Sequence, residues 1–94
     1  MRTVQLTPEA ERALGDQVDY LIANNAPIAA DNLAVRVESF LTKTLATYPR
    51  TGRHITERDL WETWIPNTRL VAWYVFTDSE LTVLAIWHTA QDRR

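Results

Sequence analysis

Two nearly continuous apolar runs in the C-terminal third of the chain most constrain how it folds. Arg69–Phe76 and Leu81–His88 each have the length and composition of a strand, and the polar segment 77–80 (TDSE) between them is typical of a hairpin turn. Because successive side chains of a strand point to opposite faces of a sheet, both faces of this hairpin are apolar. Each face of the hairpin is therefore expected to pack against another part of the chain or against a partner.

The N-terminal half of the chain predicts a cover for one face. Arg2–Leu6 alternates apolar and polar residues, as a short strand does. Thr7 and Pro8 then mark a helix start, because a threonine side chain accepts a hydrogen bond from a first-turn amide and proline fits the first helical position. Apolar residues follow at helical spacing, at Ala10, Leu14, Val18, Leu21 and Ile22.

A second helix is predicted from Pro27 to the residue before Pro49. The connector of residues 24–26 is so short that the two helices are expected to be antiparallel neighbours. Gly15 costs the first helix about 1 kcal/mol relative to alanine, and we attribute its presence to close packing. The apolar stripe of the second helix comprises Leu33, Val37, Phe40, Leu41, Leu45 and Tyr48.

The order of these elements predicts one α+β domain over residues 1–94. After a loop at Arg50–Glu57 with Gly52 as its hinge, a strand is expected at Arg58–Ile65, followed by the two strands of the apolar hairpin. The predicted fold is therefore an N-terminal strand, an antiparallel helical hairpin and a three-stranded antiparallel meander, with the helices packed on one face of the sheet.

The other face of the sheet is predicted to be apolar and open. Arg69 is the residue least suited to burial under the helices, so its side of the strand is assigned to the open face. The three-residue spacing of Trp61 and Trp64 sends these side chains to opposite faces of a regular strand. We expect a protein partner to cover the open face, since a lone monomer rarely exposes so large a patch; a β-bulge or a folded-back tail is the alternative. The helix side is assigned Leu70, Tyr74, Phe76, Leu84 and Ile86, and the open face Val71, Trp73, Val75, Val83, Ala85 and Trp87.

Composition and charge exclude several classes of function. The chain has no cysteine, which excludes disulfides and thiolates, and neither histidine has a carboxylate at ligand spacing, so no metal site is expected. No apolar run approaches the ~20 residues of a membrane span and no secretory leader is visible, which indicates a cytoplasmic protein. With a net charge of −2, no direct DNA binding by the chain alone is expected. With only two glycines, no phosphate-binding loop and no cofactor is expected.

The chain resembles the RelE/ParE superfamily of toxins from bacterial type II toxin–antitoxin modules. The resemblance runs through the opening LTPEAERAL, the helical hairpin, the loop TYPRTGR, the strand that begins with Arg69, and the ending AIWHTAQDR. It implies the fold predicted above and a cognate antitoxin as partner.

Two activities are implied by this resemblance. RelE-like members are ribosome-dependent mRNA endonucleases, and such cleavage needs a base, a cation and an acid; Arg69 and His88 are the candidates here. The chain departs from that pattern, because Ala90 and Gln91 replace the expected basic residues and no tyrosine follows His88. ParE-like members act without catalysis by binding DNA gyrase, and the departures favour this branch. A non-toxic module that only binds antitoxin is a further alternative.

Candidate contact residues lie at the ends of strands and on the open face. His88 leaves the last strand beside a polar tail, where its ordinary role is that of a structural histidine, and the ordinary role of Arg69 is an ion pair with Glu62 or Asp92. The predicted target-binding residues are Arg53, Arg69, His88, Arg93 and Arg94. The predicted antitoxin-binding residues are Val71, Trp73, Val75, Val83 and Trp87.

Overall fold

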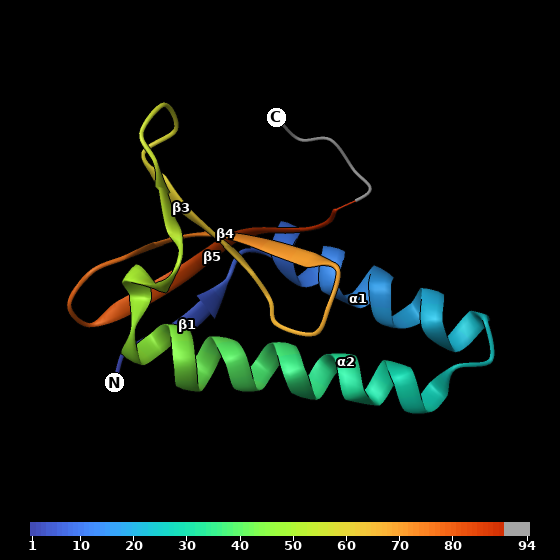
Figure 1. Ribbon diagram of the computed structural model, residues 1–94. Helices are drawn as coiled ribbons and strands as arrows, with labels where there is room; N and C mark the ends of the chain where they lie inside the picture. The colour runs from blue at the N-terminus through green and yellow to red at the C-terminus, as the bar shows by residue number, and fades with distance from the viewer. Residues whose placement is uncertain (90–94) are drawn as a thin grey trace.

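The computed structural model describes residues 1–89 and confirms the α+β class, with two helices packed against a five-stranded sheet (Figure 1). Figure 1 shows the helical hairpin along one side of the sheet, with the connection between the helices extending beyond it. The elements follow in the order β1 (Thr3–Leu6), α1 (Pro8–Ala23), α2 (Pro27–Ser39), β2 (Arg53–Ile55), β3 (Leu60–Trp64), β4 (Leu70–Phe76) and β5 (Glu80–His88).

Helix α1 begins as its sequence predicts. The Thr7 hydroxyl accepts a hydrogen bond from the Ala10 amide at 3.2 Å, and Pro8 occupies the first turn. Ala10 is fully buried, whereas Ile22, which was assigned to the apolar stripe, is 54% exposed. The last turn of α1 extends past the sheet, so Leu21 there is only half-buried and Ile22 is exposed (Figure 1).

Helix α2 does not end in a regular turn but continues into a π-helical segment, Phe40–Leu45. The wider π turn shifts the register of the residues that follow it. Phe40, Leu41 and Leu45 are buried as predicted, but Tyr48 is 67% exposed because it no longer lies on the same stripe. A 3₁₀ turn at Pro49–Thr51 then leads the chain to the sheet.

The sheet has the strand order β1-β5-β4-β3-β2, in which β1 is parallel to β5 and the other pairs are antiparallel. The loop predicted at Arg50–Glu57 contains the short strand β2, and the strand predicted from Arg58 begins only at Leu60. Asp59 adopts the left-handed conformation (φ 51°) in the turn between β2 and β3, which closes a tight hairpin. The meander therefore has four strands instead of three.

A β-bulge in β5 corrects two face assignments. Trp73 pairs with Ala85 and Tyr74 pairs with Val83, so Leu84 is the extra residue. Val83 consequently packs with the helix-side core and Leu84 packs with the opposite cluster, the reverse of the prediction. The Leu84 carbonyl accepts a hydrogen bond from the Thr7 hydroxyl at 2.8 Å, which joins the bulge to the start of α1.

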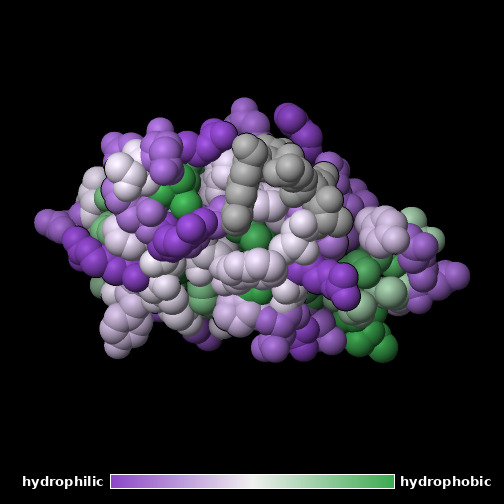
Figure 2. Space-filling model, turned by 45° about the horizontal axis from the view of Figure 1, so that its top comes forward, coloured by the Kyte–Doolittle hydropathy of each residue, from purple (hydrophilic) through white to green (hydrophobic). Residues whose placement is uncertain are grey.

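The face away from the helices carries a second, smaller hydrophobic cluster. Val71, Trp73 and Trp87 are 1%, 9% and 6% exposed, so the expectation that these side chains lie bare in the lone chain is wrong. Trp64 pairs with Val71 on this face and is 59% exposed, while Trp61 packs with the helix-side core. On the face seen in Figure 2, the apolar colour forms separate patches among hydrophilic residues. The cluster consists of Leu60, Val71, Trp73 and Trp87, bordered by Ile55, Val75, Leu84 and Ala85.

Within residues 1–89, neither helix combines the length and the apolar character that a membrane crossing requires.

Candidate functional site

Arg69 and His88 lie at the same end of the sheet. His88 pairs with Leu70, and the Thr89 amide donates a hydrogen bond to the Arg69 carbonyl at 2.9 Å. Leu70 belongs to the helix-side core, so the His88 side chain lies on the helix side as well. Arg69 is exposed in the bend before β4. The predicted target-binding residues Arg93 and Arg94, like Ala90, Gln91 and Asp92, lie outside the described residues.

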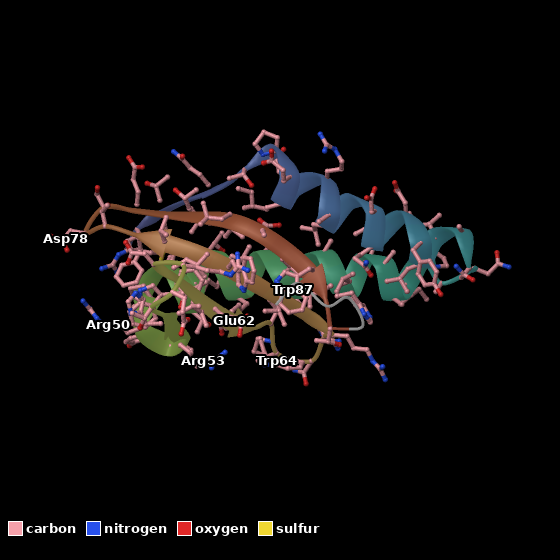
Figure 3. All side chains as sticks on the ribbon, turned by 90° about the horizontal axis from the view of Figure 1, so that it is seen from above. Arg50, Arg53, Glu62, Trp64, Asp78 and Trp87 are labelled. Atoms are coloured by element: carbon pink, nitrogen blue, oxygen red, sulfur yellow. The ribbon has the colours of Figure 1, made fainter. Side chains whose placement is uncertain are left out.

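A buried carboxylate organises the middle of the opposite face. Glu62 is 5% exposed and accepts hydrogen bonds from Trp73 Nε1 at 2.7 Å and from Arg53 Nη2 at 3.1 Å. Arg53 forms an ion pair with Glu62, one of the two carboxylates named from the sequence as ordinary partners of Arg69; the other, Asp92, lies outside the described residues. Figure 3 shows Glu62 between Arg53 and Trp87 on the sheet. The sequence signal for this position is a carboxylate inside a strand, between Trp61 and Trp64.

A shallow cleft surrounds this carboxylate. The Arg58 guanidinium lies over the Trp73 ring, with its Cζ 5.1 Å from the ring centroid. Two arginines and two glutamates line the cleft, so its formal charge is balanced. The lining residues are Arg53, Ile55, Glu57, Arg58, Glu62 and Trp73.

The loop after the helices is fixed by one buried phenol. The Tyr74 hydroxyl donates to the Pro49 carbonyl at 2.5 Å and accepts from the Gly52 amide at 3.2 Å. Burial raises the pKa of Tyr74 above its ordinary value of 10.0, and the hydrogen bond from Gly52 lowers it by less. A side chain at Gly52 would meet the Glu62 carbonyl oxygen and the Tyr74 hydroxyl, so only glycine fits in this loop.

A row of aromatic rings lies on the helix side near β2. His54 and Trp61 have ring centroids 5.3 Å apart, and Trp61 and Phe76 have centroids 5.5 Å apart. His54 Nε2 lies 3.4 Å from an oxygen of Asp59. No group of three or more potential metal ligands comes together in the part of the chain that the structure describes.

Two guanidinium groups lie over the last ring of this row. The Cζ atoms of Arg2 and Arg50 are 5.4 and 5.5 Å from the Phe76 centroid. Arg2 was not a candidate from the sequence, because no local pattern indicates that residue 2 meets residue 76. The parallel pairing of β1 with β5 brings these residues together.

Comparison with known proteins agrees with this architecture. The family described as "ParE toxin of type II toxin-antitoxin system, parDE" matches residues 4–93. Among solved structures, the chain is similar to one described as "Chromosomal ParDE TA system from P. aeruginosa", with a TM-score of 0.75 and 19% sequence identity over 94% of this chain and 96% of that one. This structural likeness shows the fold. No match is found among curated protein sequences. Since the family match spans nearly the whole sequence, the chain belongs to the ParE toxin family of type II toxin–antitoxin systems.

Proposed function

We propose that the protein is a toxin that inhibits DNA gyrase by binding it, and that a cognate antitoxin neutralises it in the cytoplasm. The family match over residues 4–93 carries this proposal. The distribution of the cations other than Arg69, which lies at the same end of the sheet as His88, also favours it over mRNA cleavage. Arg2 and Arg50 lie at the Phe76 end of β4, whereas His88 pairs with Leu70 at the other end, so these cations are far from the imidazole. Cleavage of RNA needs an acid, a base and a cation around one phosphate.

The target-binding residues remain Arg53, Arg69 and His88 among those the structure describes. Arg69 is exposed beside the end of β5, and Arg53 is 66% exposed although its guanidinium contacts Glu62. Both arginines can therefore reach a partner without disruption of the core. Arg93 and Arg94 stay part of the proposed set on the basis of sequence alone.

One experiment separates the candidate activities. The toxin is produced without its antitoxin while mRNA cleavage is mapped, and purified toxin is added to gyrase in supercoiling and DNA-breakage assays. We expect intact mRNA and gyrase-dependent inhibition or breakage. Codon-proximal cuts that His88→Ala abolishes would instead identify a nuclease. Normal growth with neither effect would identify a module that only binds antitoxin.

For the antitoxin, we propose two surfaces, one on each side of the sheet. The first is the face that carries the second hydrophobic cluster, where Val71, Trp73 and Trp87 are buried. Val75 and Leu84, which the bulge moves to this face, remain partly accessible there. Val83 is no longer part of this set, since it is fully buried on the helix side. The second is an apolar groove between β1 and the helices, lined by Val4, Leu6, Leu14, Ala34, Val37, Glu38, Leu41 and Thr42.

Trp64 provides the sharpest test of the first surface, because it is 59% exposed there. We expect Trp64→Glu to weaken binding of the cognate antitoxin by at least about thirtyfold, the loss typical of an exposed tryptophan that a partner buries. Val35→Glu is the matched control, since Val35 is 65% exposed on α2 and does not line the groove. Equal affinities of the two variants, measured by calorimetry, would place the antitoxin elsewhere.

A further inference from the structure

A hollow at the Phe76 end of the sheet contains two guanidinium groups and no carboxylate. The hollow is lined by Arg2, Thr47, Tyr48, Pro49, Arg50 and Thr51. It lies on the helix side, because Phe76 packs against the helix-side core. It is therefore distinct from the cluster face that we propose for the antitoxin and from the cleft around Glu62, and it shares no lining residue with the groove between β1 and the helices.

Arg2 is held in place by backbone carbonyls. Its Nε donates to the Thr77 carbonyl at 2.6 Å, and its Nη1 donates to the Ala46 carbonyl at 3.2 Å. These two contacts join the end of the helical hairpin to the turn between β4 and β5. The orientation of the Arg2 guanidinium is thus set before any ligand binds, which reduces the entropy lost on binding.

Arg50 has unused hydrogen-bonding capacity. Among residues 1–89 its side chain forms no hydrogen bond and no ion pair, and its guanidinium lies over the Phe76 ring. The loop that carries it is fixed by the contacts of Tyr74 with Pro49 and Gly52. Figure 3 shows Arg50 at the outer edge of the molecule, away from the labelled Glu62. Five N–H donors in a fixed fork are therefore presented to solvent beside a second guanidinium.

We propose that this hollow binds a carboxylate side chain of an acidic protein segment. The guanidinium groups of Arg2 and Arg50 both contact the Phe76 ring and both line the hollow, so they repel each other, and an anion bound in the hollow reduces that repulsion. A carboxylate accepts two parallel hydrogen bonds from the fork of Arg50. The exposed ring of Tyr48 borders the hollow and offers an apolar contact to the residue next to that carboxylate.

The surroundings favour a protein segment over nucleic acid. The turn that binds Arg2 continues into Asp78 and Glu80, which are both exposed, and the chain as a whole has a net charge of −2. A nucleic acid carries a phosphate at every nucleotide and would bring further negative charges toward these residues. An extended peptide can place one carboxylate in the hollow while the neighbouring side chains point to the opposite side, which limits this repulsion.

The site is tested by titration of the purified protein with an end-blocked tetraglutamate peptide, followed by the side-chain N–H signals of Arg50 in NMR spectra. Tetraglutamine and oligothymidylate serve as comparison ligands. We expect tetraglutamate to shift the Arg50 signals, and Arg50→Gln to weaken its binding about tenfold or more, the effect of one lost charge-assisted contact. The affinity of Arg50→Lys for tetraglutamate should lie between those of the wild type and Arg50→Gln, because lysine keeps the charge and lacks the forked N–H donors of arginine.

Arg12→Gln is the matched control, since Arg12 is an exposed arginine on α1 outside the hollow. The affinity of Arg12→Gln for tetraglutamate should differ from that of the wild type by less than about twofold, because Arg12 lies outside the hollow and salt screens exposed charges that make no direct contact. Equal weakening by Arg12→Gln and Arg50→Gln would overturn the proposal in favour of general charge attraction. Absence of any shift at Arg50, or tighter Arg50-dependent binding of oligothymidylate, would overturn it as well. The result of this titration does not depend on whether gyrase is the target of the protein.

Discussion

The Tyr74 hydroxyl lies 2.5 Å from the Pro49 carbonyl oxygen, although the two residues are 25 positions apart in the chain. Since the same hydroxyl accepts a hydrogen bond from Gly52, one buried phenol fixes both ends of the loop that presents Arg50. The structure of this surface loop is therefore determined by a residue of the central sheet.

Removal of that hydroxyl should destabilise the protein. Tyr74→Phe leaves the buried Pro49 carbonyl and the Gly52 amide without a partner, and we expect the free energy of unfolding to fall by about 1–3 kcal/mol. Urea denaturation measures the change. Tyr20→Phe is the control, because Tyr20 is 64% exposed on α1 and should change stability by less than about 0.5 kcal/mol. Similar losses in both variants would show that the hydroxyl of Tyr74 has no special role.

Stability should also decrease in alkaline solution through Tyr74. Burial raises its pKa in the folded protein above 10.0, so the unfolded chain loses this proton at a lower pH than the folded protein does. The stabilisation by the neutral Tyr74 hydroxyl is fully present below the pKa of Tyr74 in the unfolded chain. It is lost as pH rises through the pKa of Tyr74 in the folded protein. The free energy of unfolding should therefore fall more steeply above pH 10 in the wild type than in Tyr74→Phe. Parallel pH profiles of the two proteins would contradict this assignment.

The two glycines should respond to alanine in opposite directions. A Cβ at Gly52 would lie 2.5 Å from the Glu62 carbonyl oxygen and 2.6 Å from the Tyr74 hydroxyl, so Gly52→Ala should cost about 1–3 kcal/mol of stability. Nothing lies within 4 Å of a Cβ at Gly15, which contradicts the close packing expected there. Gly15→Ala should therefore stabilise the helix by about 0.5–1 kcal/mol. Thermal unfolding of both variants measures the difference, and a loss of stability in Gly15→Ala would show that the helix has an unseen constraint.

Glu62 should stabilise its face mainly as a hydrogen-bond acceptor. Glu62→Ala leaves the Trp73 indole N–H without its acceptor in a buried site, and we expect a loss of about 1–3 kcal/mol. Glu62→Gln keeps a carbonyl oxygen for Trp73, so its loss should be smaller. Denaturation followed by tryptophan fluorescence compares the two. If both variants lose equal stability, the charge contact with Arg53 is the dominant interaction of Glu62.

Hydrophobic periodicity predicted most of the fold, because the elements that hold it together are regular. Helix α1, its cap at Thr7 and the apolar strands β4 and β5 follow directly from spacing. The bulge at Leu84 was not predictable, because both faces of β5 are apolar and its sequence has no alternation that one extra residue would interrupt. Strand β2 was missed because three residues with two basic side chains carry no alternation signal.

The candidate sites were less accessible to prediction, because they depend on residues far apart in the sequence. Arg2 reaches Phe76 only through the pairing of the first and last strands. The partner of Arg53 is Glu62, which becomes its neighbour through the β2–β3 hairpin. The sequence does place Arg69 and His88 at strand ends, and strand register then brings their backbones together.

The pairing of β1 with β5 has a consequence for how the chain folds. Residues 3–6 are synthesised early, yet their sheet partners at residues 80–83 emerge from the ribosome only after most of the chain. The helical hairpin can form during synthesis, but the helix-side core stays incomplete until β5 supplies Leu81, Val83 and Ile86. The sheet is therefore expected to be completed only after β5 has been made, and a partner that binds the helical hairpin before then would meet a chain whose structure is incomplete.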